Sequence, residues 1–330
     1  MKRITILFGG TNTERLVSVA SAQALHSALP DADLWFWDMA GSVHQVASQT
    51  LLQHSRPFED AFRPGTPSVG AIEAALDKAH AEDRLLVLGL HGGMAENGEL
   101  QAMCELRRIP FTGSGSASSH LAFDKMAAKR FAAIAGVGSA DGIALDDIDA
   151  AFAEHGKLIA KPARDGSSYG LIFVNAQQDI VAVRNAARTE EYLIEPFIAG
   201  VEATCGVLER SDGSVFALPP IEIIPGGDGF DYTAKYLLKS TQEICPGRFA
   251  PEISAAIMDK AMKAHRALSC TGYSRTDFIV SAKGPVYLET NTLPGLTKAS
   301  LYPKALKAQG IDFVDFLQDQ IALAMIRTPS

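Results

Sequence analysis

The 330-residue sequence contains few cysteines, and none of them lies in a metal-binding pattern. Cys104, Cys205, Cys245 and Cys270 are far apart in the chain, form no C-x-x-C pair and have no cluster of histidines beside them. This spacing argues against a structural zinc site. We therefore expect four reduced thiols.

The sequence also lacks a long hydrophobic run and an excess of basic residues. Apolar residues make up 47% of the chain, which is typical of a globular protein, but no run is long enough to span a bilayer. The opening MKRITILFGG has a short apolar stretch that stops at two glycines, which predicts a first strand and not a signal peptide. The formal net charge of −8, with scattered Lys and Arg, disfavours nucleic-acid binding. We expect a cytoplasmic protein with no nucleic-acid or membrane partner.

No internal repeat or low-complexity tract is present, and the length predicts two or three domains. In the first third of the chain, short apolar runs alternate with helical patterns, which predicts a parallel sheet with crossover helices. Turn signals at Asp212-Gly213 and Lys283-Gly284 predict hairpins in the second half. The expected fold class is α/β followed by α+β with antiparallel strands.

A helix and a polar loop are predicted in the centre of the chain. SSHLAFDKMAAKRFAAIAGVG has an alanine-rich 3.6-residue period, which predicts helical structure that ends at Gly136, with Lys125 at the start of a helix. KPARDGSSYG, residues 161–170, predicts a turn between two short strands whose N–H groups can wrap a phosphate. It is not a Walker loop, because no G-K-[ST] follows, and a plain hairpin is the ordinary explanation of such a loop. Lys125, Lys161 and Lys235 lie in three separate segments that could converge on one polyphosphate.

The most informative polar pattern lies in the predicted C-terminal hairpin. Glu289 and Asn291 share one face of the second strand, and Arg275 and Asp277 share one face of the first. The tight turn can bring all four side chains together. Two carboxylates and an amide oxygen suit Mg²⁺, which completes its shell with water and phosphates. The alternative is that Arg275 pairs with the acids on a solvated sheet face.

Two other segments, one after the predicted C-terminal hairpin and one before it, favour a ligand-binding site. Gly295 permits close approach of the backbone to a ligand, and Ser300 and Leu301 can open a helix whose N-terminus favours an anion. Between residues 225 and 246 the sequence has no clear period, which predicts either a disordered segment or an active-site lid.

Several acids and one histidine allow two interpretations each. Glu195 follows a buried strand and, with Glu202, could bind an amine or a ribose edge, although solvated carboxylates are more common. The turn LFGGTNTERL does not match the dinucleotide pattern G-x-G-x-x-G. In addition, the carboxylate of Glu14 would repel a pyrophosphate. Glu14 either stabilises its own helix dipole or meets an ammonium group. His91 ends a predicted strand amid glycines and is either structural or near a ligand.

Taken in order, eight motifs resemble the D-alanine–D-alanine ligases of the ATP-grasp superfamily. They are LFGGTNTERLVS, LHGGMAENGELQ, IPFTGSG, DK, KPARDGSSYG, DYTAKY, SRTDF and LETNTLPGLTKASLYPKA, and they span essentially the whole chain. The resemblance implies a homodimer of three-domain chains (1–113, 114–197 and 198–330), with ATP between the second and third domains. It also implies that ATP drives the joining of two D-alanines through an acylphosphate, for peptidoglycan precursor synthesis.

The resemblance further implies a set of site residues by position. Two Mg²⁺ ions, with Mn²⁺ as the alternative metal, would be held by Asp277, Glu289 and Asn291. ATP would be contacted by Lys125, Lys161, Ser168, Glu195, Phe197, Glu202 and Lys235. The first D-alanine and closure of the lid would depend on Glu14, Ser167 and Tyr236, with His91 nearby. The oxyanion and the carboxylate of the second substrate would meet Arg275, Gly295, Ser300 and Leu301.

Two positions depart from the family pattern, and other substrates remain open. Gly229-Phe230 precede Asp231-Tyr232 where the family commonly has two aromatics, and Leu16 replaces a usually charged residue. Both bear on lid closure or substrate preference, so a paralogue using D-serine or D-lactate and a specialised amino-acid ligase remain alternatives. Tyr236 argues against D-lactate, a preference associated in the family with loss of the lid tyrosine. A non-catalytic nucleotide-binding module would lose the metal ligands, and all three are present.

Overall fold

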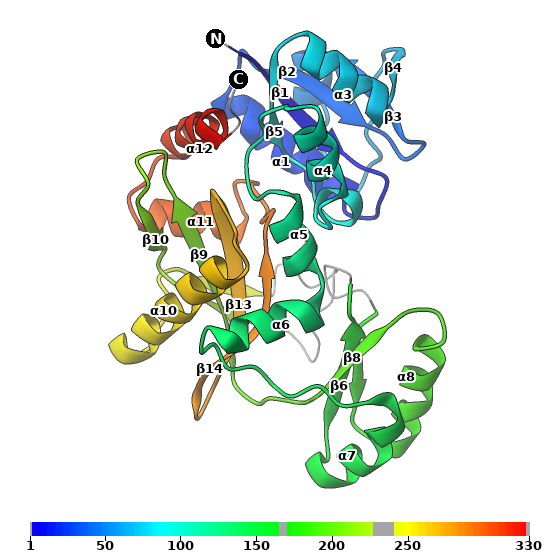
Figure 1. The fold of residues 1–330 in the computed structure, drawn as a ribbon, viewed down its shortest axis with the longest axis vertical. Helices are drawn as coiled ribbons and strands as arrows, with labels where there is room; N and C mark the ends of the chain where they lie inside the picture. Colours follow the sequence, from blue (N-terminus) through cyan, green and yellow to red (C-terminus); the bar gives the residue numbers. More distant parts are fainter. Residues whose placement is uncertain (1, 165–169, 227–240, 328–330) are drawn as a thin grey trace.

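A computed structural model describes residues 2–164, 170–226 and 241–327, and the strands in these ranges form three sheets (Figure 1). The first is five-stranded in the order β4-β3-β2-β1-β5, and a small one has the order β7-β6-β8. The last is six-stranded in the order β12-β11-β9-β13-β14, with β10 paired to β9. Each sheet is built from one continuous stretch of the chain, as expected of a multidomain protein.

The first sheet is mixed. β1 pairs in parallel with β2 and β5, as the alternating pattern predicts, whereas β3 and β4 add antiparallel strands at the edge. A short turn after β2 brings β3 back beside β2 in the antiparallel direction, so the connection between these two strands needs no crossover helix. The strands are β1 (Arg3–Gly9), β2 (Asp33–Trp37), β3 (Ser42–Val46), β4 (Ser68–Ala71) and β5 (Arg84–Leu88). The accompanying helices are α1 (Arg15–Ala28), α2 (Ser48–Leu52), α3 (Ile72–Ala81), η1 (Gly93–Ala95) and α4 (Glu99–Leu106).

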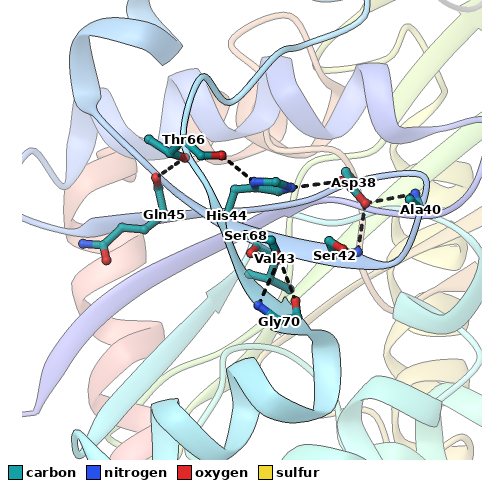
Figure 2. A network of polar contacts seen from close by, with 9 residues as sticks. All are labelled: Asp38, Ala40, Ser42, Val43, His44, Gln45, Thr66, Ser68 and Gly70. Carbon is teal, nitrogen blue, oxygen red and sulfur yellow. Dashed lines mark hydrogen bonds and ion pairs between the residues drawn. The ribbon is translucent and has the colours of Figure 1, made fainter.

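A polar network fastens the antiparallel edge of this sheet (Figure 2). Nε2 of His44 lies 2.9 Å from Oδ2 of Asp38, and Nδ1 lies 2.9 Å from the carbonyl oxygen of Thr66. The ring therefore bridges the Asp38 side chain and the Thr66 backbone. Asp38 also accepts hydrogen bonds from the backbone N–H groups of Ala40 and Ser42. The network therefore closes the turn after β2 and ties a distant loop to β3.

The small sheet and its helices form the lower lobe in Figure 1. β6 pairs antiparallel with both β7 and β8, which confirms the two strands predicted on either side of the polar loop. Residues 165–169 of that loop lie outside the described ranges. The elements are η2 (Leu145–Asp147), α7 (Ile148–His155), β6 (Leu158–Pro162), β7 (Ile172–Val174), η3 (Gln177–Asp179), α8 (Ile180–Ala186) and β8 (Tyr192–Pro196).

The last sheet contains both predicted hairpins. β9 pairs antiparallel with β10, and β13 with β14, so the turn signals at Asp212-Gly213 and Lys283-Gly284 are confirmed. Its strands are β9 (Val201–Glu209), β10 (Val215–Ala217), β11 (Ile221–Ile224), β12 (Gln242–Ile244), β13 (Tyr273–Ser281) and β14 (Gly284–Asn291). The helices that follow or cover it are α10 (Pro251–Ala267), α11 (Leu301–Ala308) and α12 (Phe313–Arg327).

One hydrophobic core joins the first and last sheets. It includes Phe8 of β1, Leu25 of α1, Tyr273 of β13, Tyr302 of α11 and Phe316 of α12, all almost fully buried. The C-terminal helices thus pack both sheets together, which holds the ends of β1 and β5 near the C-terminal hairpin. Within the described ranges, no helix has the length and apolar character needed to cross a membrane.

The stretch predicted to be helical up to Gly136 contains two helices. α5 (Ser116–Phe123) ends and α6 (Lys125–Ile134) begins at Asp124, whose ψ of 100° is extended. Oδ1 of Asp124 accepts a hydrogen bond from the Ala127 N–H at 3.0 Å, which makes the carboxylate an N-cap. The prediction that Lys125 starts a helix is therefore confirmed. α6 packs against α10 and β14, so its first turn lies beside the C-terminal hairpin.

We predict that His44→Ala lowers the free energy of unfolding by about 1–2 kcal/mol, because one side chain bridges two acceptors at the sheet edge. Urea denaturation at neutral pH measures the change. His80→Ala removes an exposed histidine of α3 and should change stability by less than about 0.5 kcal/mol. Equal stabilities of the two variants would show that the network does not stabilise the edge.

Candidate functional site

The C-terminal hairpin brings its four polar residues onto one face. Asp277 lies opposite Glu289, and Arg275 lies opposite Asn291, in the register of β13 and β14. Residues directly opposite each other on antiparallel strands, and residues two apart on one strand, project to the same side. The arrangement is the one that the hairpin pattern predicts.

Cationic side chains contact both carboxylates of this face. Arg275 donates to Asp277 through Nε at 3.0 Å and through Nη2 at 2.9 Å. Oγ1 of Thr204 also donates to Asp277, at 2.5 Å. Nζ of Lys125, from α6, lies 3.6 Å from Oε2 of Glu289. The ion pair that the sequence offered as an alternative to a metal site is therefore present, but Asp277 and Lys125 are only 9% and 6% exposed, so the face is not simply solvated.

The oxygen atoms of this face fit a divalent cation by their chemistry. Oδ1 of Asn291 accepts a hydrogen bond from the Leu293 N–H at 2.8 Å, which fixes the amide beside the two acids. Carboxylate and amide oxygens are ligands that Mg²⁺ accepts, and an oxygen can take a second partner. No group of three His, Cys, Asp or Glu residues in the described ranges could hold a metal. A cation here would thus depend on the amide, water and phosphate oxygens as well as on the two acids.

Two lysines converge on one buried acid at the edge of the small sheet. Nζ of Lys161, on β6, lies 3.0 Å from Oε2 of Glu195 on the neighbouring strand β8. Lys129, on α6, forms an ion pair with Oε1 of the same carboxylate. Burial lowers the pKa of Lys129 to about 7 and that of Lys161 to about 8. Glu195 is only 2% exposed, so it is not the solvated carboxylate that is commonly found at such positions.

Lys129 is a candidate site residue that the sequence interpretation missed. It lies four residues after Lys125 on α6, and these two lysines are 7% and 6% exposed. Residues at this spacing share one face of a helix. The spacing of two lysines in an otherwise alanine-rich face was a usable signal. Through them, α6 reaches Glu289 on one side and Glu195 on the other.

His91 links the end of the first sheet to the loop after β14. Its Nε2 lies 2.9 Å from Oγ of Ser21, and its Nδ1 lies 3.1 Å from the carbonyl oxygen of Leu293. The carbonyl can only accept, so Nδ1 carries the proton and Nε2 accepts from the hydroxyl. Burial lowers the pKa of His91 to about 4, which keeps the ring neutral. These contacts favour the structural interpretation of His91.

Two more acids lie where the glycine-rich turns after β1 and β5 meet. Glu14 is 8% exposed, and a Cβ placed on Gly92 would come within 2.3 Å of its Oε2. Gly92 also has φ +65°, so both space and backbone conformation require glycine there. Burial raises the pKa of the Glu96 carboxyl to about 7, while a hydrogen bond with Gly92 and the charge of Arg275 oppose the shift. The sequence interpretation included this acid's motif but did not single out Glu96.

The segment after β14, which contains Gly295, leads into α11 as predicted. Ser300 is the N-cap residue of α11, and its Oγ lies 2.7 Å from Oγ1 of Thr297. A Cβ on Gly295 would come within 2.8 Å of that same Oγ. The backbone at Gly295 and the start of the helix at Leu301 therefore lie close together.

The remaining predicted residues are either separate from these clusters or outside the described ranges. Phe197 follows β8, is 43% exposed and packs edge-on against Phe173 at 6.3 Å between ring centroids. Glu202 lies on β9, opposite residues of β11 and β13, and Leu16 is half-buried on α1. The predicted residues that lie outside the described ranges are Ser167, Ser168, Gly229, Phe230, Asp231, Tyr232, Lys235 and Tyr236.

Known proteins resemble this chain over nearly its full length. The profile described as D-ala D-ala ligase N-terminus matches residues 3–114, and the profile described as D-ala D-ala ligase C-terminus matches residues 153–322. The D-alanine–D-alanine ligase of Halalkalibacterium halodurans is 34% identical, covering 98% of this chain and 99% of that one.

Solved structures share the fold as well. The VanG D-Ala:D-Ser ligase from Enterococcus faecalis has a TM-score of 0.80 and 30% identity, covering 98% of this chain and 99% of that one. The D-alanine–D-alanine ligase from Bacillus anthracis, complexed with ATP, has a TM-score of 0.75 and 25% identity, covering 99% of this chain and 98% of that one.

We predict that the His91 ring stays uncharged as the pH falls from neutrality to about 5, because its pKa is lowered to about 4. NMR of the imidazole signals, assigned by comparison with His91→Gln, measures this. The same ring in the urea-unfolded protein should titrate near about 6.5. Since only the unfolded state gains the proton between these values, the contribution of His91 to stability decreases as the pH falls through that window. A folded-state titration above pH 6 would contradict the prediction.

Proposed function

Because the chain belongs to the D-alanine–D-alanine ligase family, whose ATP-dependent enzymes serve peptidoglycan synthesis, we propose that it joins two D-alanine molecules through an acylphosphate. The observation that carries this proposal is the cross-strand pair Asp277 and Glu289, with Lys125 beside it. Acids and a lysine gathered on one partly buried face suit a magnesium-bound triphosphate.

We place ATP between residues 114–197 and 198–330, with residues 1–113 as the third domain. Lys161 of the small sheet supports this placement, because the charges of Glu289 and Lys125 both act on its ammonium group. Phosphates would be held by Lys125, Lys161 and Lys235, with the turn at Ser168. The adenosine would meet Glu195, Phe197 and Glu202.

The first step would activate the carboxylate of one D-alanine. Its ammonium group would pair with Glu14, whose burial strengthens such a pairing, and Ser167 and Tyr236 would complete this contact. A carboxylate oxygen attacks the γ-phosphorus, the bond to the bridging oxygen breaks, and ADP leaves. Asp277, Glu289 and Asn291 would hold two Mg²⁺ ions, which when bound supply positive charge against the phosphate oxygens.

The second step would form the peptide bond. The unprotonated amine of the second D-alanine attacks the acyl carbon, phosphate leaves with its bonding electron pair, and the nitrogen loses a proton. Arg275 and the Gly295 N–H would stabilise the oxyanion of the tetrahedral intermediate. The second carboxylate would bind at the start of α11, where Ser300 and Leu301 lie, because backbone N–H groups there favour an anion. The segment 225–246 would close over the site and exclude water.

A D-alanine–D-serine ligase is the second candidate. The specific observation in its favour is the likeness to the VanG D-Ala:D-Ser ligase, at 30% identity over 98% of this chain. Either product uses the same phosphoryl-transfer residues. We further propose a cytoplasmic homodimer, in line with the family's usual assembly.

We predict that Glu289→Gln lowers ATP-dependent phosphate release with D-alanine by at least about 100-fold, because one anionic ligand of the proposed metal site is lost. Glu154→Gln changes an exposed acid of α7 and should leave the rate unchanged. Near-normal turnover of Glu289→Gln would refute the metal site.

Removal of a phosphate contact gives an independent test on the small sheet. Lys161→Ala should lower the same activity by at least about 100-fold, because the developing negative charge loses a buried cation. Lys157→Ala removes an exposed lysine just before β6 and is the matched control. Similar rates for both variants would exclude Lys161 from phosphoryl transfer.

The second substrate is identified by a panel of D-alanine, D-serine, D-lactate and L-amino acids. We expect phosphate release and a ligated product with D-alanine alone, since it can occupy both subsites. If release requires D-serine beside D-alanine, the second candidate is correct. Release with an unrelated amino acid and none with D-alanine would indicate a specialised ligase.

A further inference from the structure

Glu195 is a buried carboxylate with a lysine on each oxygen. Lys161 reaches Oε2 at 3.0 Å from the neighbouring strand, and Lys129 reaches Oε1 from α6. The side chains of Lys129 and Lys161 are 8% and 13% exposed, and that of Glu195 is 3% exposed. When all three groups are ionised, the cluster carries one negative and two positive charges with little solvent to screen them.

The two lysines differ in what else surrounds them. Nζ of Lys129 also lies 3.4 Å from the carbonyl oxygen of Ala140, and the negative charge of Asp141 favours its protonated form. Lys161 instead experiences the charges of Glu289 and Lys125, the residues of the proposed phosphate corner. Lys129 thus has partners besides Glu195 at Ala140 and Asp141, whereas Lys161 experiences the charges of the proposed phosphate corner.

These surroundings create a conflict for Lys161 if it binds phosphate. A lysine that turns toward a triphosphate weakens its pairing with Glu195, and a buried acid deprived of its partner is strongly destabilised. That cost would oppose ATP binding unless another cation remained on the carboxylate. Lys129 occupies the second oxygen and meets this requirement.

We propose that Lys129 is a positioning residue which keeps Glu195 charge-balanced and thereby releases Lys161 to the phosphates of the nucleotide. The inference rests on the proposed function, because it takes Lys161 as a phosphate contact. It assigns Lys129 a role in the affinity for the triphosphate and none in recognition of the adenosine. Without the Lys129 charge, Glu195 retains Lys161 as its counter-charge among the described residues.

The test compares the affinities of ATP and adenosine, measured by calorimetry with Mg²⁺ present, in the wild type and in Lys129→Met. The variant should bind ATP about 10- to 100-fold more weakly, which is the loss of roughly one charge-assisted hydrogen bond. Adenosine affinity should change less than about twofold, because in the variant Lys161 stays on Glu195 as its counter-charge and the carboxylate that would meet the adenosine keeps its place. Lys129→Arg keeps the charge and should retain most of the ATP affinity.

A double-mutant comparison separates charge balance from packing. In a Glu195→Gln background, Lys129→Met should no longer lower the ratio of ATP affinity to adenosine affinity, because no carboxylate competes for Lys161. The same loss in both backgrounds, or an equal loss for ATP and adenosine, would overturn the proposal. If Lys129→Met does not fold, Lys129→Gln is measured in its place, since it removes the charge and keeps a polar group.

Failure of this inference is distinct from failure of the proposed function. If the wild type does not bind ATP, the ligase proposal itself fails. If the wild type binds ATP and the uncharged Lys129 variants bind it equally well, the ligase proposal survives and only the role of Lys129 is wrong.

Discussion

The arrangement of the candidate site depends on charge balance among buried acids and cations from different parts of the chain. Glu195 of β8 meets Lys129 and Lys161, and Glu289 of β14 meets Lys125. α6 supplies a lysine to each acid and so connects the small sheet with the C-terminal hairpin. Since an unpaired buried charge costs several kcal/mol, the almost fully buried Glu195 cannot lose both lysines without a replacement partner, whereas the Glu289 side chain is 33% exposed and partly stabilised by water. A triphosphate with its metal ions is a partner of the required charge.

Buried ion pairs of this kind contribute little net free energy to the stability of a fold. Replacing a buried pair by apolar side chains of similar volume is often neutral or stabilising, because the charges lose their hydration. Their concentration around two strand ends therefore suggests a role in binding. The same reasoning applies to Arg275, which pairs with Asp277 and which we propose also meets an oxyanion on the same face. In each case the cation that balances an acid is also the group that a phosphate or oxyanion would attract.

The N-terminal part is held against this site by contacts of a different kind. His91 joins Ser21 to the carbonyl oxygen of Leu293 as a neutral ring. At the other end of the chain, Arg327 donates to the carbonyl oxygen of Gly113 at 2.8 Å, next to the start of the central region. The hydrogen-bond partners of His91 and Arg327 named here are neutral groups. The charges of a bound substrate would therefore affect these hydrogen bonds less than they affect the ion pairs of the lysines. These hydrogen bonds provide a fixed frame for Glu14, the acid that we propose meets the first substrate.

Local pattern in the sequence was sufficient to predict the parallel centre of the first sheet, the β13–β14 hairpin and the shared face of Asp277 and Glu289. The reason is that strand periodicity and turn chemistry act over a few residues. The pairing of Lys129 with Glu195 and the neutral state of His91 could not be predicted in this way. They arise between segments far apart in the chain and depend on burial, which only tertiary packing decides. The start of a helix at Lys125 was a local feature and was predicted, although the alanine-rich period continues across the N-cap at Asp124.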